Sequence, residues 1–392
     1  PEIDPIGTDP MIVLIVEFTG QEPESPFYGP EHNNIPEPGP YDNTMFWIDD
    51  FTPTHYENMM FDQTPGARSM ANYYLEQSYG MFTIEGDVIG WIQIPHSEWW
   101  YGADDPAGGH DNFNGRVSRI VEDAVDYANI QFPGIPWADY DQDGDGIIDH
   151  LAIIHAGEDQ AAGGGAQGDD AIWSHSWWTE EPYEAAPGVY AYYYTIMPEN
   201  GNIGVFSHEF GHDLGLPDSY DTIYSGESSP AFWDLMSTGS WLGDAETLDT
   251  RPSHISVWGK MALGWIGPWN MKTYSLSDLT KGKNLQIEQV ETDGGIKAVR
   301  VNLPSQVVQV PYGGLYDWWG NEGNLIDTKL TRTVDLTGKS TATLTFWTWY
   351  DIESYWDFGF VQVSTDGGAT WTSLYDMEGR VTTAHDPDAM QE

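Results

Sequence analysis

The sequence contains no cysteine, which excludes disulfide bonds and thiolate metal ligands. Basic residues are also scarce: 14 Lys and Arg stand against 62 Asp and Glu, for a formal net charge of −48. Nucleic acid and anionic membrane surfaces are therefore poor partners, because both carry the same sign of charge.

Two explanations of the acidity remain open. Clustered carboxylates can serve divalent cations, whose hard oxygen ligands they provide. Alternatively, an acidic surface suits salty surroundings or solubility, and the seven lysines favour this reading for most of the charge. Only the clustered aspartates favour the first explanation.

Long hydrophobic runs are missing as well. The strand-like run near the start, Met11–Val16, has six residues, whereas a membrane-spanning helix needs about 20. No signal peptide is present, and the chain begins at Pro1 rather than Met. We expect a mature, secreted form cut from a longer precursor, although a recombinant product with a chosen start fits equally well.

The 392 residues predict about two domains. Residues 1–268 mix apolar runs typical of buried strands, such as Met11–Phe18, with helical patterns over Arg116–Ala128 and Ile203–Leu214. The expected fold of this part is α+β.

Helical patterns disappear after residue 268, and short β-like runs alternate with turn signals. Strands are predicted at Thr341–Trp349 and Phe358–Ser364, with a hairpin turn at Asp366-Gly367-Gly368. Residues 269–392 are expected to form an all-β, jelly-roll-like sandwich. It is cut short, because no closing strand follows Asp386, and we expect the natural chain to continue.

The segment His208-Glu209-Phe210-Gly211-His212 carries the chemistry. Two histidines four residues apart on a helix project from one face and can bind one metal ion. Zinc binds imidazole readily, and a catalytic zinc site takes three protein ligands and keeps one position open. Glu209 lies beside the metal, where it can accept a proton from a water molecule.

The third ligand is predicted close by. Gly215 ends the helix, Pro217 prevents it from resuming, and the sharp turn can bring Asp218 back to the metal. The alternative is a surface helix whose two histidines are solvated, because this short motif also arises by chance. The added Gly215 and Asp218 and the segment around Met236 favour the metal site.

Several strings resemble the immune inhibitor A family of bacterial secreted metalloproteases. They are residues 204–221 around the histidines, Trp233–Trp241, Trp258–Trp265, Tyr73–Gly80 and Gly90–Ile92. The similarity covers most of residues 11–270, and Val334–Leu374 is similar to that family's β-domain.

The resemblance implies a zincin of the metzincin type. His208, His212 and Asp218 would bind zinc, Glu209 would be the general base, and Met236 would lie beneath the metal. Many metzincins place an oxyanion-stabilising Tyr two residues after this Met, but that position is Thr238 here. Tyr220 and Tyr224 are the candidates for the role, on proximity alone.

A calcium loop is predicted at 141–149. Asp141, Asp143 and Asp145 occupy positions 1, 3 and 5, and Gly146 occupies position 6, where such loops turn sharply. Ile147, at position 7, would contribute its carbonyl oxygen, and Asp149 is at position 9. Position 12 is Ala152 rather than Glu, so this is not a full EF-hand. The alternative, an acidic surface turn, leaves four close carboxylates to repel one another.

A second calcium site is possible at Asp351, Glu353 and Asp357, on composition and on the resemblance. His155 and His175 are isolated in the sequence and are interpreted as structural. The predicted function is a secreted zinc endopeptidase, with one catalytic Zn²⁺, one or more structural Ca²⁺ ions and protein substrates. The rival is a non-catalytic secreted glycan- or surface-binding protein that carries a relic zincin domain and binds through its Trp-rich β-domain.

Overall fold

The computed structural model describes residues 5–377, except 21, 23–27, 40, 106–110, 112–115, 223–225, 227–228, 245–246, 280–281, 283, 293, 306, 308, 322–327, 353–357 and 376. The chain divides into two compact units, residues 1–303 and 304–392. Among the described residues, no helix is both long enough and apolar enough to cross a bilayer.

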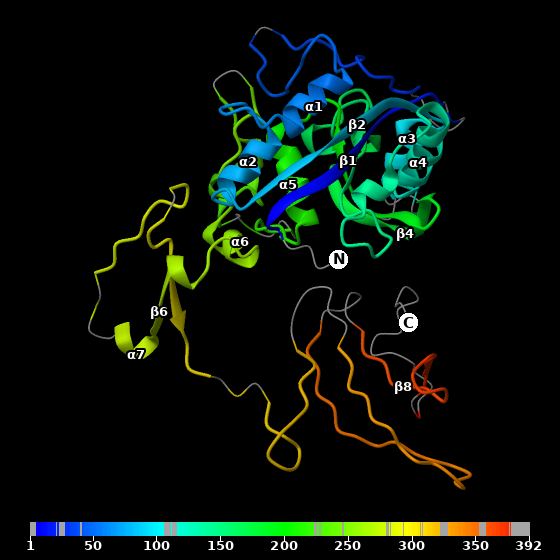
Figure 1. The fold of residues 1–392 in the computed structure, drawn as a ribbon, viewed down its shortest axis with the longest axis vertical. Coiled ribbons are helices and arrows are strands. Elements are labelled where there is room, and N and C mark those ends of the chain that lie inside the picture. Colours follow the sequence, from blue (N-terminus) through cyan, green and yellow to red (C-terminus); the bar gives the residue numbers. More distant parts are fainter. Residues whose placement is uncertain are drawn as a thin grey trace. The chain divides into compact units, whose positions relative to one another are not determined.

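A five-stranded mixed sheet organises the first unit (Figure 1). Its strand order is β2-β1-β3-β5-β4, and every neighbouring pair is parallel except β4 with β5. The strands are β1 (Gly7–Phe18), β2 (Phe82–Ile94), β3 (Leu151–His155), β4 (His175–Ala186) and β5 (Val189–Pro198).

Strand β1 lies inside the sheet, between β2 and β3. Its apolar residues from Met11 to Val16 are at most 1% exposed, because helices cover both faces of a largely parallel sheet. The buried strand predicted at Met11–Phe18 is confirmed, and it begins earlier, at Gly7.

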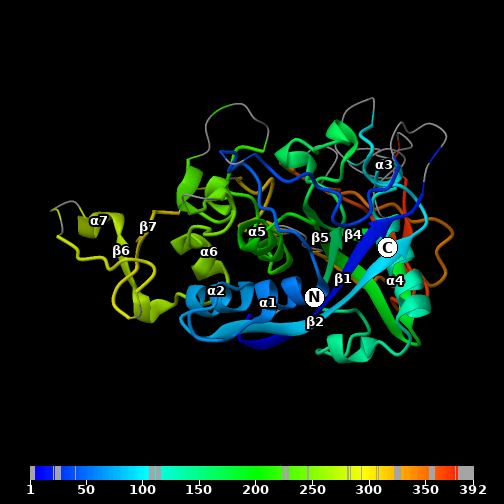
Figure 2. The same ribbon diagram turned by 90° about the horizontal axis from the view of Figure 1, so that it is seen from above.

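Alternate side chains of β1 point to opposite faces of the sheet and pack into two separate hydrophobic cores. One face packs against α1 (Pro53–Phe61), α2 (Met70–Gln77) and α5 (Ile203–Asp213), and the other packs against α4 (Arg119–Gln131). Figure 2 shows α1, α2 and α5 to one side of β1 and α4 to the other. Helix α5, which carries the histidine motif, is therefore held against the sheet by the larger core.

Shorter elements connect this framework. The remaining helices are α3 (Glu98–Gly102), α6 (Val257–Ala262) and α7 (Leu276–Leu279), with 3₁₀ turns at Trp137–Tyr140, Gln160–Ala162, Gly168–Asp170, Ala231–Trp233, Thr238–Trp241 and Pro268–Asn270. Strands β6 (Met271–Ser275) and β7 (Ala298–Asn302) form a separate parallel pair.

Helix α2 begins at Met70, where the Ser69 hydroxyl accepts a hydrogen bond from the Asn72 amide. Residues before it form a turn in which the Ala67 amide donates to the Thr64 carbonyl. Strand β2 is continuous over residues 82–94, since β1 supplies ladder partners along it with one irregularity between Gly90 and Ile92.

The second unit shows less regular structure among its described residues. Strands β8 (Gln362–Val363) and β9 (Thr372–Ser373) pair antiparallel. The predicted turn between them is present: the Asp366 carboxylate accepts the Thr370 amide at 3.0 Å. The strand predicted at Thr341–Trp349 is not observed, because these residues have no ladder partner, and a strand exists only through such pairing.

The tight pairing of β1 with β2 depends on Gly86, which lies opposite Met11. A Cβ atom at Gly86 would lie 1.9 Å from the Met11 carbonyl oxygen, which is backbone and cannot rotate away. We predict that Gly86→Ala destabilises the protein by about 3 kcal/mol, as overpacking of a core does. Gly39→Ala is the control, since nothing lies within 4 Å of its Cβ. Equal melting temperatures for the two variants would contradict the argument.

Candidate metal centre

Helix α5 begins in a network of hydrogen bonds to its backbone amides. The Asn202 side chain accepts the Ile203 amide, and the Asp249 carboxylate accepts the amides of Asn202 and Val205, both at 2.6 Å. These bonds satisfy amides that a helix leaves without partners in its first turn. The segment carrying Asp249 packs so closely that a Cβ at Gly204 would lie 2.3 Å from its carboxylate. The start of α5 is thus fixed.

The two histidines of α5 are fixed by their Nδ1 atoms. His208 Nδ1 lies 2.9 Å from the Leu235 carbonyl oxygen, and His212 Nδ1 lies 2.7 Å from the Leu216 carbonyl oxygen. A carbonyl oxygen only accepts, so each Nδ1 carries the proton and each Nε2 presents a lone pair. This is the arrangement by which proteins orient metal-binding imidazoles.

The end of α5 follows the sequence prediction closely. Gly215 adopts φ +89°, its amide donates to the His212 carbonyl, and the Leu216 amide donates to the Gly211 carbonyl. This pair of bonds is the Schellman motif, which reverses the chain direction after a helix. The reversal places the Leu216 carbonyl against His212 and returns Asp218 to the histidine face.

Three acceptor atoms converge at that point. His208 Nε2, His212 Nε2 and Asp218 Oδ1 form a triangle with all three sides at 3.2 Å. Asp218 Oδ1 is buried and has no hydrogen-bond donor, and both imidazoles use their protons elsewhere. A cation among them would relieve the repulsion between lone pairs at this spacing. Tetrahedral zinc about 2.1 Å from each ligand separates its ligands by about 3.4 Å, so the residues present fit zinc.

Glu209 lies beside this triangle and is 5% exposed. Burial raises the pKa of its carboxyl to about 7, against the lowering effect of His208 and His212. A carboxylate whose pKa is near neutrality can both take and return a proton, which suits a general base that later acts as an acid. The position beside two metal-binding histidines is the one predicted from the sequence.

Met236 lies directly beneath the helix turn between the histidines. A Cβ atom at Gly211 would lie 2.5 Å from the Met236 sulfur, so the glycine of the motif is required by this contact. Met236 is 2% exposed, and its carbonyl accepts hydrogen bonds from both the amide and the hydroxyl of Ser219. The residue after Asp218 is therefore tied to the methionine segment.

Comparison with known proteins agrees with this geometry. Residues 4–266 match the model of the immune inhibitor A peptidase M6 catalytic domain. The chain belongs to this family. Residues 281–391 match the immune inhibitor A-like MAM domain. The resemblance inferred from the sequence motifs is confirmed.

Two curated relatives illustrate the relationship. Immune inhibitor A of Bacillus thuringiensis subsp. alesti is 36% identical over 93% of this chain and 56% of its own length. The pre-pro-metalloprotease PrtV of Vibrio cholerae serotype O1 (strain M66-2) is 31% identical over 97% of this chain and 43% of its own length. The M6 chain therefore spans about half the length of these relatives.

Asp234 is a positioning residue that the sequence analysis did not assign. It is 3% exposed, and its carboxylate accepts hydrogen bonds from the Ser219 hydroxyl at 3.0 Å and from the Ser256 amide at 3.0 Å. Its backbone carbonyl accepts the amides of Ser237 and Gly239. Asp234 thus joins the segment of Asp218 to the methionine turn. Its place in the string around Met236 was the only sequence signal.

Three of the four aspartates predicted to bind calcium converge. Oxygen atoms of Asp141, Asp143 and Asp145 lie within 4.8 Å of one another in the M6 chain. Asp141 accepts the amides of Gly144 and Gly146, and both glycines have φ above +70°. Asp149 bends back to accept the Gln142 amide at 2.6 Å. The loop is anchored beyond its tip, where the Ile148 amide donates to the Tyr190 carbonyl.

The structure describes only some of the other candidates. Asp351 is exposed, and Glu353, Asp357 and Tyr224 lie outside the described residues. Tyr220 is partly buried and Thr238 is exposed, and the oxyanion donor stays a prediction.

The two isolated histidines both bond to backbone carbonyls. His155 Nδ1 lies 3.1 Å from the Ala156 carbonyl oxygen, and His175 Nδ1 lies 2.7 Å from the Trp173 carbonyl oxygen.

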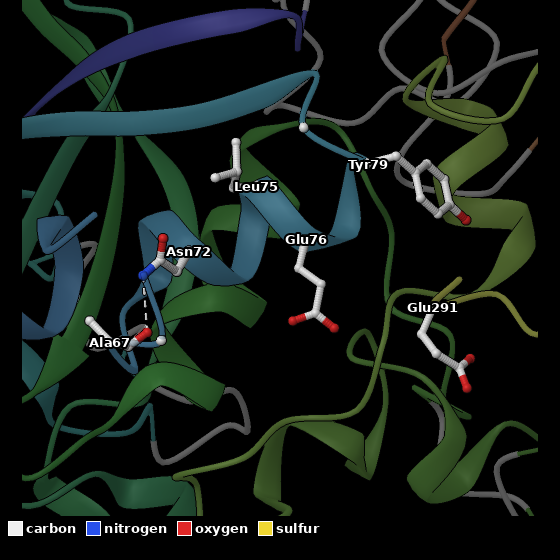
Figure 3. Close-up of a pocket in the computed structure, with 8 residues that line it drawn as sticks. Ala67, Asn72, Leu75, Glu76, Tyr79 and Glu291 are labelled. Carbon is white, nitrogen blue, oxygen red and sulfur yellow. Dashed lines mark hydrogen bonds between the residues drawn. The ribbon is translucent and has the colours of Figure 1, made fainter. Parts of the chain in front are cut away.

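A cavity of about 590 Å³ lies away from this chemistry (Figure 3). It is open to solvent and bounded by α2 and the segment around Glu291. Its lining residues are Gly66, Ala67, Asn72, Leu75, Glu76, Tyr79, Gly80 and Glu291, none of which belongs to the metal centre. Cavity size therefore does not identify the functional site of this M6 chain.

The contact between Gly211 and Met236 can be tested by a double-mutant cycle. Ala in place of Gly favours a helix by about 1 kcal/mol, but here its methyl group meets the Met236 sulfur. We predict that Gly211→Ala lowers the melting temperature and weakens zinc binding despite the helix propensity. Adding Met236→Ala to Gly211→Ala should recover part of the loss, with a coupling of about 1–2 kcal/mol. Strictly additive effects would show that the two residues do not interact.

Proposed function

We propose that this chain is a zinc-dependent endopeptidase that hydrolyses peptide bonds of protein substrates. The observation that carries the proposal is the convergence of His208, His212 and Asp218 acceptors beside the buried carboxyl of Glu209. Membership of the M6 peptidase family supports it. A helix with solvated histidines would not bury three acceptors against one another.

An extended substrate has a natural place on the sheet. Strand β4 is the last in the strand order, and within the described residues its ladder partner is β5 alone. An edge strand offers free amides and carbonyls to which a peptide can add as a further strand. Helix α5 contacts β4 directly, so a peptide bound there would lie near the metal centre.

The chemistry divides between the ion and the protein. When bound, zinc would polarise the scissile carbonyl and lower the pKa of a water molecule. Glu209 accepts the proton of that water at a carboxylate oxygen and returns it to the departing amine. His208 and His212 each donate the Nδ1 proton to a backbone carbonyl, which orients both Nε2 atoms toward the cation. Asp218 contributes negative charge that holds the cation in place.

We predict that Glu209→Ala retains the fold and one zinc per chain but loses at least about 100-fold in kcat, because no group takes the proton. Casein hydrolysis and anomalous scattering at the zinc edge measure the two properties. Glu57→Ala, which removes an exposed glutamate from α1, is the matched control. Turnover of Glu209→Ala at a tenth of the parent rate or above would show that Glu209 is not the base. Zinc on residues other than His208, His212 and Asp218 would overturn the ligand assignment.

The rival function, a non-catalytic glycan- or surface-binding protein, makes a different prediction. Such a protein would bind its target with or without chelator and would hydrolyse nothing. The intact constellation of three ligands and Glu209 favours the peptidase. We also propose secretion, protein substrates as partners and no nucleic-acid partner, in keeping with the net charge of −48.

We propose further that residues 269–392 form a β-sandwich. The match to the MAM domain over residues 281–391 and the antiparallel pair β8–β9 support it. A domain boundary near residue 268 is supported by the two family matches, which end at residue 266 and resume at residue 281.

Calcium binding by the loop 141–149 is a separate proposal. Asp141, Asp143, Asp145 and Asp149 would contribute carboxylate oxygens, and Ile147 would contribute its carbonyl. The convergence of the first three carboxylates and the positive φ of Gly144 and Gly146 support it. Burial raises the pKa of Asp149, and nearby Asp143 and Asp141 add to the effect, so a neighbouring cation would relieve the charge.

We predict that calcium raises the melting temperature and that Asp143→Ala loses most of this response while keeping its zinc. A ligand bound only by the folded state adds about 2.7 kcal/mol at 100 times its Kd. The measurement uses the inactive Glu209→Ala background at fixed zinc, which removes autolysis. Asp139→Ala, an exposed aspartate just outside the loop, is the control. A full calcium response in Asp143→Ala would mean that the loop is an acidic turn.

A further inference from the structure

A second group of buried acceptors surrounds the connection from β3 to β4, residues 156–174. Glu98 in α3 is completely buried, and Asp111 is 4% exposed. Glu98 Oε1 accepts the Ile172 amide at 3.2 Å, and Asp111 Oδ2 accepts the Trp173 amide at 2.9 Å. Because these amides are consecutive in the chain, the two carboxylates approach the same short stretch of backbone.

Gln160 joins the same group. Its backbone amide donates to the Ile172 carbonyl at 3.1 Å, and its side-chain nitrogen donates to Asp104 Oδ2 at 3.1 Å and to the Asp169 carbonyl at 2.8 Å. The other oxygen of Asp104 accepts the Asp111 amide at 3.1 Å. Hydrogen bonds therefore tie Glu98, Asp111 and Gln160 into one closed cluster.

One oxygen of each of these three side chains has no partner. Glu98 Oε2, Asp111 Oδ1 and Gln160 Oε1 are all buried acceptors without a hydrogen bond. A single unsatisfied buried polar group costs about 1–3 kcal/mol, and more when it is charged. Native proteins seldom leave three together, so each needs a physical account.

The surroundings do not supply the missing positive charge. Burial raises the pKa of both Glu98 and Asp111, and further carboxylates of Asp104, Asp159 and Glu158 add to the effect. Two histidines are near: His155 Nδ1 is 3.5 Å from Glu98 and His175 Nδ1 is 3.7 Å from Asp111.

Both histidines are neutral. Each Nδ1 donates to a backbone carbonyl, Ala156 for His155 and Trp173 for His175. Burial lowers the pKa of each imidazole to about 4. Among the described residues, the contacts of the cluster thus gather oxygen acceptors and carboxyl groups with no cationic side chain to balance them.

We propose that Glu98, Asp111 and Gln160 bind a calcium ion through these three oxygens, at a site distinct from the loop 141–149 and from the zinc centre. Carboxylate and amide oxygens are the ligands that Ca²⁺ prefers, and backbone carbonyls and water complete its usual six to eight contacts. Mg²⁺ is disfavoured, because it gives up its water reluctantly and the cluster is buried.

The ion would order the connection into the edge strand. Ser174 directly precedes β4, and its hydroxyl donates to the Asp159 carboxylate at 2.6 Å. Asp159 lies within the same connection, and its carboxylate also accepts the Ser174 amide at 3.2 Å. Calcium at Glu98 would therefore fix α3, the connection and the start of β4 together. Binding itself does not depend on the proposed peptidase activity.

The decisive measurement is the calcium content of the folded full-length chain. Glu98→Gln keeps the shape of the side chain and removes its charge. We expect this variant to bind one calcium fewer per chain than the parent by calorimetry and mass spectrometry, and to gain less in melting temperature from calcium. Asp169→Asn, an exposed aspartate of the same connection, should match the parent in both.

Terbium provides an independent probe, because Trp99 and Trp100 follow Glu98 directly and Trp173 donates its amide to Asp111. Tryptophan-sensitised Tb³⁺ emission should be displaced by Ca²⁺ and should fall in Glu98→Gln and Asp111→Asn. If either variant fails to fold, anomalous diffraction from parent crystals soaked in Tb³⁺ should locate an ion at Glu98. An unchanged calcium count in folded Glu98→Gln, or an ion at 141–149 with none at Glu98, would overturn the proposal.

Discussion

The metal centre depends on two hydrogen bonds that do not touch the metal position. Through Nδ1–H, His208 donates a hydrogen bond to the Leu235 carbonyl and His212 donates one to the Leu216 carbonyl. These bonds fix the tautomer, turn both Nε2 lone pairs to one point and lock the rings in place. Had either imidazole kept its proton on Nε2, it would simply donate to Asp218 and no cation would be needed.

The carbonyls that hold the histidines come from segments that are themselves fixed. Leu216 is held by the Schellman turn at Gly215, and Leu235 lies between Asp234 and Met236 in a turn that reaches back to Ser219. Glycines at positions 204 and 211 let these segments approach α5 more closely than a side chain would permit. The centre is thus the meeting point of one helix and two turns.

Buried carboxylates in this protein fall into two groups. Those of Glu199 and Asp249 accept backbone amides with both oxygens, so neither oxygen is left without a hydrogen bond. Glu98 and Asp111 each satisfy only one oxygen. The contrast within one fold distinguishes a carboxylate that organises backbone from one that awaits a cation. It also shows where some of the acidic residues behind the net charge of −48 lie, which composition alone does not.

Local pattern alone determined the elements whose signals are short-range. Each of these signals depends on residues within about ten positions of one another. They are the apolar run of β1, the histidine spacing on α5, the glycine at Gly215 that ends the helix, and the aspartate spacing of 141–149. The helix predicted at Arg116–Ala128 is observed at Arg119–Gln131, because a hydrophobic period indicates which face of a helix is buried and not where the helix ends. In the second unit, part of the strand predicted at Phe358–Ser364 is observed as β8, whereas the strand predicted at Thr341–Trp349 is not, because pairing partners define a strand.

Only the tertiary structure decided what surrounds the metal centre. Asp234, Asp249 and the Glu98 cluster act through residues 15 to 74 positions away, and no sequence period records such distances. Whether a buried acid is satisfied depends on which amides the fold brings to it. The sequence therefore predicted the three side chains that converge at the metal centre. The fold determines which histidine nitrogens donate to backbone carbonyls and which buried carboxylate oxygens have no hydrogen bond.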